Sequence, residues 1–387
     1  MRDATRGRFT LIFAGGGTGG HLMPGLGVAA DLRERRPDAR LLFVGASSEL
    51  ERSMVEKRGF EFMGLPSLKY TGGPLQAPGW MARSAGGLLG ARRLVKRVKP
   101  NLIVSLGGHA ALAPSLAGVL QGVPLAAMEQ NAIPGKVNRI LSWWAREIYV
   151  PWSGTEGSFS YPDRVHVTGN PVRSDLLHRG KQLAERFGLS PRKKTLLVMG
   201  GSQGAQFLNR AVTGALPRLE REAEWLQVLH SAGALGYEEA AQLYRKSAVQ
   251  SAVFPFIEDM AAAYALSDLA FCRAGGTTLA ELTALGVPAV LVPLPTAAND
   301  HQRKNADVVA GAGAAMLVDQ TDLTGDALAG ILLNLLKNET CLSRMRAASL
   351  RLGKPTATAN VINRLLALLG EGALPVAAHA EVQEQAI

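Results

Sequence analysis

The chain has few cysteines and lacks a long apolar run at its start, and both absences limit where it can work. Its 387 residues include only two cysteines, Cys272 and Cys341. They are too few for a disulfide framework, so we expect ordinary buried thiols in a reducing compartment. The first apolar run stops at a group of glycines and is too short for the core of a signal peptide. The sequence therefore predicts a protein that stays in the cytoplasm.

Acidic residues are missing from one long region. No Asp or Glu occurs between Phe62 and Met128, whereas basic residues do: Lys69, Arg83, Arg92, Arg93, Lys96, Arg97 and Lys99. The net charge of +10 is thus unevenly spread, and the region predicts a positive patch. Its partner could be nucleic acid, an anionic substrate or an anionic membrane surface. Few aromatic residues are interleaved and no nucleic-acid motif is present, so nucleic acid is the least favoured partner.

Two common nucleotide-binding signatures are incomplete in the first glycine-rich stretch, AGGGTGGH at residues 14–21. Gly15, Gly17 and Gly20 fit the dinucleotide spacing, but the second strand ends without the acidic residue that would hold a ribose. No Lys-Ser or Lys-Thr pair follows the glycines, which disfavours a P-loop. The turn still suits a phosphate or a sugar hydroxyl, because glycines let a ligand approach the backbone and the next helix directs N–H groups at it.

Metal-binding patterns are also lacking. No Asp-x-Asp pair occurs, and the seven histidines show no ligand spacing. The sequence therefore predicts neither a metal site nor a cofactor.

What is present is a repeated alternation of apolar strands and helices. In the first half the expected strands are Phe9–Phe13, Arg40–Val44, Leu102–Ser105, Pro124–Ala127 and Ile148–Val150. In the second half they are Thr195–Met199, Trp225–Leu229, Ala252–Phe254, Leu269–Cys272 and Ala289–Val292. Such alternation is typical of parallel sheets covered on both faces. Because each half begins with a strand that runs into glycines, we expect an α/β protein of two Rossmann-like, doubly wound parallel-sheet domains facing across a cleft.

Domain boundaries follow from the same patterns. We expect an N-terminal domain at residues 1–169 and a C-terminal domain at 170–353. A helix within 354–370 has Val361, Ile362, Leu365 and Leu366 on one face and is expected to pack back on the first domain. The tail at 371–387 is rich in Ala, Glu and Gln, has little to bury and is expected to be disordered.

A second glycine-rich turn has the residue types of a nucleotide-sugar site. It reads FCRAGGTTLAE from Phe271 to Glu281, and a helix that starts near Thr277 would direct its N–H groups at a diphosphate. Glu281 can accept from both hydroxyls of a ribose, while Gln302 and, one turn away, Asn305 can bind sugar hydroxyls. A glycine cap, a surface glutamate and an ordinary helix start would explain these residues equally well.

Short motifs over about residues 9–370 resemble one family. In chain order they are GGTGGH at Gly15–His21 with one extra glycine, PG at Pro24–Gly25, EQN at Glu129–Asn131, GNPVR at Gly169–Arg173, GGSQGA at Gly200–Ala205, FIEDMAAAYA at Phe256–Ala265, CRAGG at Cys272–Gly276 and DHQxxNA at Asp300–Ala306. Singly they are modest signals, but together and in this order they are highly specific. The chain resembles the MurG family of bacterial transferases, which complete the last lipid-linked precursor of peptidoglycan.

The resemblance implies a GT-B glycosyltransferase. Such an enzyme moves N-acetylglucosamine with inversion from UDP-N-acetylglucosamine to the C4 hydroxyl of the muramyl peptide on undecaprenyl diphosphate, at the cytoplasmic face of the bacterial cell membrane. The N-terminal domain would serve the acceptor and the membrane, and the C-terminal domain the donor. Donor contacts would fall on Thr18, Gly19, Gly20, Asn131, Arg173, Ser202, Ile257, Gly276, Thr277, Thr278, Leu279, Ala280, Glu281 and Gln302. No metal is required, since a helix dipole and Arg can replace a divalent ion.

Several residues are candidates for the base that accepts the proton of the acceptor hydroxyl. His21 follows the first glycine turn and is the expected principal base. His109 stands where the family commonly has Tyr, and Met128 stands where it commonly has His. We therefore expect His109 to support acceptor binding or proton release, with Glu129 as the next candidate. The rival interpretations are a related transferase with another lipid or natural-product acceptor, and a non-catalytic nucleotide-sugar or dinucleotide-binding protein.

Overall fold

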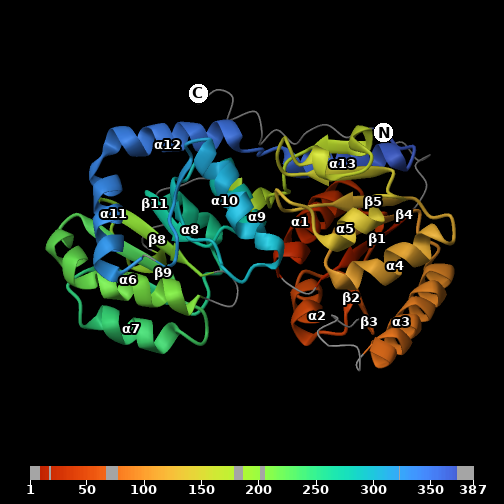
Figure 1. Ribbon diagram of the computed structural model, residues 1–387, viewed down its shortest axis with the longest axis horizontal. Helices are drawn as coiled ribbons and strands as arrows, with labels where there is room; N and C mark the ends of the chain where they lie inside the picture. The colour runs from red at the N-terminus through yellow and green to blue at the C-terminus, as the bar shows by residue number, and fades with distance from the viewer. Residues whose placement is uncertain are drawn as a thin grey trace. The chain divides into compact units, whose positions relative to one another are not determined.

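The computed structural model describes residues 9–16, 19–66, 77–177, 186–200, 205–321 and 323–372. They form two compact units (Figure 1). Unit 1 contains the described residues up to Arg173 and those from Thr356 onward. Unit 2 contains the described residues from Ser174 to Pro355. The chain therefore leaves unit 1 after Arg173 and returns to it for its last helix.

Unit 1 is built on a parallel sheet of seven strands in the order β3-β2-β1-β4-β5-β6-β7. The strands are β1 (Thr10–Gly15), β2 (Arg40–Ala46), β3 (Glu61–Leu65), β4 (Leu102–Gly107), β5 (Leu125–Met128), β6 (Glu147–Val150) and β7 (Val165–Val167). The α-helices are α1 (Gly19–Arg35), α2 (Glu49–Glu56), α3 (Ala77–Val98), α4 (His109–Val119), α5 (Lys136–Leu141) and α13 (Ala357–Leu368). Strand order reverses between β1 and β4, so the turns after these strands lie at the position where doubly wound sheets bind ligands.

Strand β1 shows why the sheet is covered on both faces. Its side chains alternate between two hydrophobic clusters, as a pleated strand requires. Leu11 and Phe13 pack with residues of α1 and α13, while Ile12 and Ala14 pack with residues of α3, α4 and α5. A strand buried on both sides reads as one apolar run, and this is what made β1 predictable.

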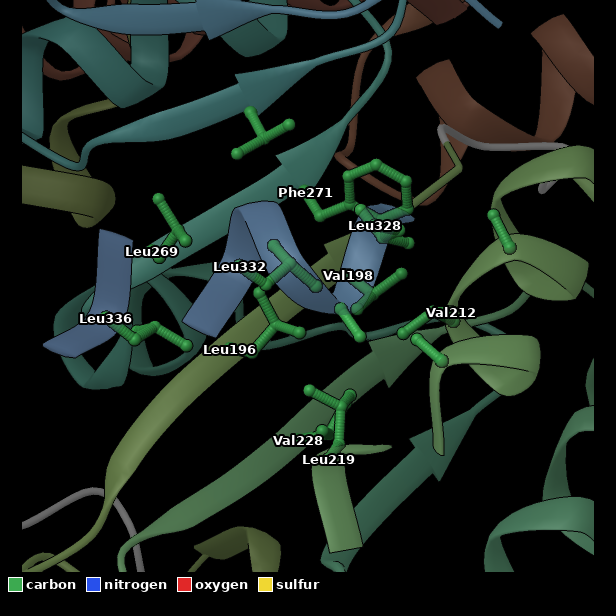
Figure 2. Packing of buried hydrophobic residues seen from close by; sticks show 14 of the residues in the cluster. Leu196, Val198, Val212, Leu219, Val228, Leu269, Phe271, Leu328, Leu332 and Leu336 are labelled. Carbon is green, nitrogen blue, oxygen red and sulfur yellow. The ribbon is translucent and has the colours of Figure 1, made fainter. Parts of the chain in front are cut away.

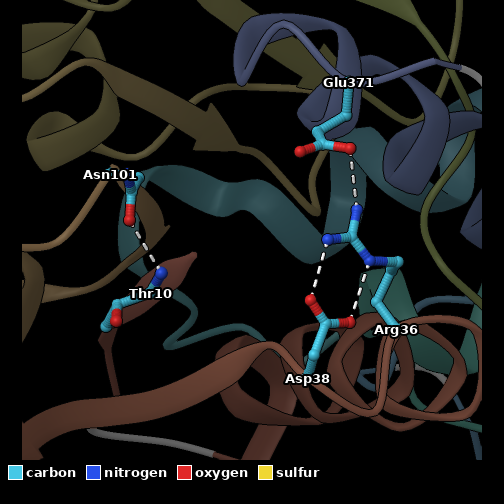
Figure 3. Close-up of polar contacts among 5 residues, drawn as sticks. All are labelled: Thr10, Arg36, Asp38, Asn101 and Glu371. Atoms are coloured by element: carbon cyan, nitrogen blue, oxygen red, sulfur yellow. Dashed lines mark hydrogen bonds and ion pairs between the residues drawn. The ribbon is translucent and has the colours of Figure 1, made fainter. Parts of the chain in front are cut away.

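Helix α13 is held on unit 1 by apolar packing and by arginine–carboxylate pairs. Val361, Ile362, Leu365 and Leu366 are buried in the same cluster as Phe13. Arg364 donates to both oxygens of Glu147 over 2.8 Å. Beyond the helix, the Glu371 carboxylate accepts from Arg36 over 2.9 Å, and Arg36 also donates to both oxygens of Asp38 (Figure 3).

The hydrogen bond to Asp38 is the main cause that raises the pKa of the Arg36 guanidinium. Glu371, where the predicted tail begins, is thus an ordered contact, whereas residues from 373 onward lie outside the described part of the chain.

Unit 2 is a second parallel sheet of six strands in the order β10-β9-β8-β11-β12-β13. The strands are β8 (Lys194–Met199), β9 (Leu226–Ser231), β10 (Gln250–Phe254), β11 (Leu269–Cys272), β12 (Ala289–Leu291) and β13 (Ala315–Leu317). The α-helices are α6 (Gln206–Leu219), α7 (Tyr237–Arg245), α8 (Met260–Leu266), α9 (Gly276–Leu285), α10 (His301–Gly311), α11 (Gly325–Lys337) and α12 (Glu339–Leu352). Here the strand order reverses between β8 and β11.

The main core of unit 2 lies between its sheet and helices α6, α7, α11 and α12. Val198 and Phe271 from adjacent strands pack with Val212 of α6 and with Leu328 and Leu332 of α11 (Figure 2). Both cysteines are free thiols, and burial raises the pKa of Cys272 to about 12. Cys272 therefore serves as a small apolar side chain at the end of β11.

The predicted fold class is confirmed, because both units are Rossmann-like parallel sheets with helices around them. Strands β3, β7 and β13 escaped prediction; each lies at a sheet edge, and two of them have only three residues. Helix α1 begins at Gly19 and contains Pro24. That the two domains face across a cleft stays a prediction.

Candidate functional site

In unit 1, His21 lies beside the turn that follows β4. It occupies the first turn of α1 and is partly exposed. A Cβ built on Gly107 would lie 3.3 Å from Cδ2 of the imidazole, and one built on Gly108 would lie 3.8 Å from Nδ1. Both glycines have positive φ, and the Gly108 Cβ would also lie 2.4 Å from the Gly16 carbonyl oxygen. Glycine is thus needed for the two turns to approach each other and the imidazole.

His109 is the first residue of α4, directly after this turn, and is partly exposed. The structure therefore brings His21 next to the loop that carries His109. Met128, which stands where the family commonly has His, is buried at the end of β5.

Glu129 follows β5, and its carboxylate is enclosed by hydrogen-bond donors from the loop after β5 and from α5. Its Oε1 accepts from Gln130 N at 3.0 Å and from Asn131 N and Nδ2 at 3.0 and 3.1 Å. Its Oε2 accepts from Gly135 N at 3.1 Å and from Asn138 Nδ2 at 3.0 Å. The residue is only 4% exposed. Five donors on two oxygens fix the loop that contains Asn131.

A chain of hydrogen bonds connects Glu129 to the glycine turn beside His21. The Asn138 amide, besides binding Glu129, donates to Met128 O over 2.9 Å and accepts from the Ser105 hydroxyl over 3.0 Å. Ser105 Oγ in turn accepts from Gly107 N over 3.2 Å. The loops after β4 and β5 are therefore held in one arrangement by buried polar groups.

The remaining residues predicted in unit 1 lie at three places. Thr18 is outside the described residues, while Gly19 and Gly20 begin α1. Arg173, the residue after which the chain leaves unit 1, lies next to α1, since its Cγ is 3.7 Å from a Cβ built on Gly27. Arg173 is thus near the helix that follows the first glycine turn.

In unit 2, the turn between β11 and α9 has the form of an anion site. Gly275 occupies the N-cap position, so no side chain there can accept from the N–H groups of the first turn at Gly276–Thr278. Leu279 and Ala280 are buried. Their backbone is also engaged, because Leu279 N donates to Gly275 O over 3.0 Å and the Thr283 hydroxyl donates to Leu279 O over 2.7 Å and to Ala280 O over 3.2 Å. Ser202, predicted for the other turn of this unit, lies outside the described residues.

Glu281 lies in the second turn of α9 and is partly exposed. Its Oε2 accepts a hydrogen bond of 2.6 Å from the Tyr264 hydroxyl of α8. Ile257, in the loop before α8, is buried. Both predicted donor contacts therefore lie beside α8: Ile257 precedes this helix in the chain, and Glu281 accepts a hydrogen bond from it.

Helix α10 lies against the same glycine turn. Asn305 is fully buried and donates to Ala274 O over 3.1 Å. This contact gives Asn305 a structural role, where the sequence suggested a sugar contact. Gln302 is partly exposed, and its Oε1 accepts from Leu294 N over 2.9 Å. Its amide NH₂ group is the part of the side chain that can donate to a ligand.

Sequence reasoning passed over Arg273, although it lies in the CRAGG motif. Its Nη1 donates to Val292 O and Pro293 O over 3.0 Å each, and its Nη2 donates to Gln320 Oε1 over 2.8 Å. Burial lowers the pKa of this guanidinium. Arg273 therefore lies just before the Gly275–Thr278 turn, with its guanidinium bonded to the segment after β12 and to Gln320.

The residues that the structure describes contain neither a metal-binding cluster nor a membrane-spanning helix. Across these ranges no group of three or more His, Cys, Asp or Glu side chains could hold a metal ion. In the same part of the chain no helix is long and apolar enough to cross a membrane.

Comparisons with known proteins match both units. Residues 11–150 match the glycosyltransferase family 28 N-terminal domain, and residues 195–362 match the glycosyltransferase family 28 C-terminal domain. A UDP-N-acetylglucosamine–N-acetylmuramyl-(pentapeptide) pyrophosphoryl-undecaprenol N-acetylglucosamine transferase of Nitratidesulfovibrio vulgaris is 38% identical over 361 residues, which is 93% of this chain and 97% of the relative. The protein of that name from Syntrophus aciditrophicus is 36% identical over 93% of this chain and 98% of its own.

A solved structure agrees with this. The crystal structure of Acinetobacter baumannii MurG superimposes with a TM-score of 0.73 at 28% identity, over 93% of this chain and 99% of that one. The chain belongs to the MurG family of glycosyltransferases.

Proposed function

We propose that this protein transfers N-acetylglucosamine from UDP-N-acetylglucosamine to the C4 hydroxyl of undecaprenyl-diphosphate-linked N-acetylmuramyl pentapeptide. This is the step from lipid I to lipid II in peptidoglycan synthesis. The observation that carries the proposal is the agreement among the relatives. They are 33–40% identical to this chain over more than nine-tenths of its length, and their names describe this activity.

Unit 2 supplies the main nucleotide site in this proposal. The first-turn N–H groups of α9 bind the diphosphate, Glu281 accepts from the ribose hydroxyls, and Gln302 donates to the sugar. Ile257, Ser202, Leu279 and Ala280 complete the contacts that we propose for unit 2. Thr18, Gly19, Gly20, Asn131 and Arg173 are the donor contacts that we propose for unit 1. The dipole of α9 and the Arg173 cation then stabilise the charge on the departing UDP.

His21 is the group that we propose to accept the proton of the C4 hydroxyl. As O4 forms its bond to C1 of N-acetylglucosamine, the bond from C1 to the diphosphate oxygen breaks and the configuration at C1 inverts. His109 supports binding of the acceptor. Glu129 remains a candidate base by residue type, but its two oxygens already accept five hydrogen bonds, which favours His21 as the proton acceptor.

We also propose that the protein docks peripherally on the cytoplasmic face of the bacterial cell membrane. Exposed basic side chains on and just after α3 support this: Arg92, Arg93, Lys96, Arg97 and Lys99. Leu89 on the same helix is 55% exposed. An exposed apolar residue among cations suits a surface of anionic lipid. Trp80, Met81 and Arg83, which belong to the same prediction, have side chains outside the described part.

The direct test is to incubate the purified protein with radiolabelled UDP-N-acetylglucosamine and lipid I in detergent. We expect label in a lipid product together with stoichiometric release of UDP. Transfer only to a different lipid or natural-product acceptor would support the related transferase. Binding of UDP-N-acetylglucosamine without turnover would support the non-catalytic protein.

A further inference from the structure

Helix α8 presents a buried tyrosine to the carboxylate proposed to bind ribose. Tyr264 is 3% exposed, and its hydroxyl donates to Glu281 Oε2 over 2.6 Å. The two residues are 17 positions apart and belong to different helices. This distance is typical of a hydroxyl that donates to a carboxylate, which is among the stronger hydrogen bonds in proteins.

The ends of α8 are fixed in a way that leaves Tyr264 little freedom. Asp259 caps the helix, since its Oδ1 accepts from Ala262 N over 3.0 Å. At the other end the Ser267 hydroxyl donates to Ala263 O over 2.6 Å. Ala262 and Ala263 are fully buried, so the short helix lies close to its neighbours. The tyrosine hydroxyl is therefore held at a defined point beside α9.

We propose that Tyr264 is a positioning residue that orients the Glu281 carboxylate for the ribose of a uridine nucleotide. The inference rests on the proposed donor role of Glu281. A glutamate side chain has three rotatable bonds, and fixing them when a ligand binds reduces affinity. The Tyr264 hydroxyl fixes the carboxylate before the ligand arrives and engages Oε2 from the protein side. The nucleotide then meets an oriented acceptor, and the effect depends on its ribose hydroxyls.

Tyr264→Phe tests the proposal because it removes one oxygen and keeps the ring. The affinity of UDP, measured by calorimetry, is expected to fall about fivefold. The affinity of 2′,3′-dideoxy-UDP, which has no ribose hydroxyls, is expected to stay within twofold of the unmodified protein. In turnover the KM for the donor should rise by a similar factor while kcat is retained.

A matched control is available in the same unit. Tyr244 of α7 is also 3% exposed, and within the described chain its buried hydroxyl has no hydrogen-bond partner. Tyr244→Phe therefore removes a comparable atom away from Glu281. It should leave UDP affinity unchanged, and the melting temperatures of the two variants show how much of any effect is loss of stability.

A double-mutant cycle separates positioning from packing. In a Glu281→Ala background, Tyr264→Phe should change UDP affinity less than twofold, because the group to be oriented is gone. An undiminished effect in that background, or equal losses for UDP and the dideoxy nucleotide, would overturn the inference. Normal UDP affinity in Tyr264→Phe, together with weakened binding in Glu281→Ala, would also overturn the inference. The proposed donor role of Glu281 would then still hold. Unchanged affinity in Glu281→Ala itself would instead remove the donor assignment and the inference with it.

Discussion

The two units use a glutamate near a glycine turn in opposite ways. In unit 1 the carboxylate of Glu129 is 4% exposed and accepts five hydrogen bonds, all from residues 130–138. In unit 2 Glu281 is partly exposed on a helix, with the Tyr264 hydroxyl on Oε2. A buried carboxylate that accepts five hydrogen bonds from nearby residues organises that segment, whereas a partly exposed carboxylate held by a tyrosine hydroxyl can serve a ligand.

The histidines extend this comparison within unit 1. Glu129 reaches the Gly107–Gly108 turn through Asn138 and Ser105, and His21 lies beside that turn. The buried acid thus supports the surroundings of the proposed base.

The largest expected effect is that of removing the proposed base. His21→Ala should lower kcat about 100-fold or more, because a positioned general base contributes on the order of 10² to 10⁴ in rate. The affinity for UDP should change little, since the imidazole acts on the acceptor hydroxyl. Steady-state rates at saturating lipid acceptor, with calorimetry of UDP binding, measure the two quantities.

His109→Ala is the matched variant on the neighbouring turn. It should act mainly on the KM for the acceptor. Near-normal turnover in His21→Ala together with collapse in His109→Ala would reverse the two roles. Normal turnover in the double variant would remove histidine from the mechanism and return attention to Glu129.

Next in size is the loss of the ribose contact in unit 2. Glu281→Ala should weaken UDP binding by about 1.5 to 3 kcal/mol, because it removes a charge-assisted hydrogen bond. This corresponds to roughly 10- to 150-fold in Kd. Calorimetry measures it, with Glu239→Ala on the exposed face of α7 as the control. Equal affinities in the two variants would contradict the assignment of Glu281.

Replacing the saturated carboxylate should affect stability. Glu129→Gln puts an NH₂ group where an oxygen now accepts from N–H groups, so buried donors lose their acceptor, at about 1 to 3 kcal/mol. Chemical denaturation should show this loss. Glu281→Gln keeps an acceptor for Tyr264 and should stay within about 0.5 kcal/mol of the unmodified protein. If Glu129→Gln kept full stability but lost kcat, Glu129 would be the base, and the structural role given to it here would be wrong.

The proposed donor site of unit 2 could be predicted further than the polar network of unit 1, because its residues are close together in the sequence. The turn and helix from Gly276 to Glu281 are consecutive in sequence, so glycines followed by a helix start already predict their geometry. The link from Glu129 to Gly107 joins three separate segments, and no spacing rule foretells a hydrogen bond between Ser105 and Asn138. The Tyr264 contact was missed for the same reason, although its motif was noted.

Long apolar strands were predictable, whereas short edge strands were not. Strand β1 is buried on both faces and gives a continuous apolar signal. Strand β13 has three residues, of which Met316 is exposed, and β7 contains His166. An edge strand is stabilised by its one neighbouring strand and by the elements that cover one of its faces. Neither can be recognised in the local sequence.

A smaller effect is expected at the proposed membrane surface of unit 1. Removing two exposed cations in Lys96→Ala with Arg97→Ala should weaken binding to vesicles of anionic lipid by about 2 kcal/mol, since each cation near the surface contributes about 1 kcal/mol. Binding should also fade as salt is added. Arg344→Ala with Arg346→Ala removes two exposed cations of α12 in unit 2 and should have no effect. Sedimentation that depends on neither salt nor anionic lipid would rule out docking through α3.

The smallest expected effect is that of removing divalent metal ions with a chelator. This experiment tests whether protein groups alone can stabilise the departing diphosphate. In unit 2 the α9 N-terminus offers N–H groups without a capping side chain, and Arg273 lies just before it. Such groups stabilise a leaving phosphate by directed dipoles and fixed charge, which is the work a divalent ion does in other transferases. We therefore expect initial rates in excess EDTA to equal those in added Mg²⁺ within error. Complete loss of activity in EDTA, restored by Mg²⁺, would show that the helix end and the arginines need a metal ion beside them.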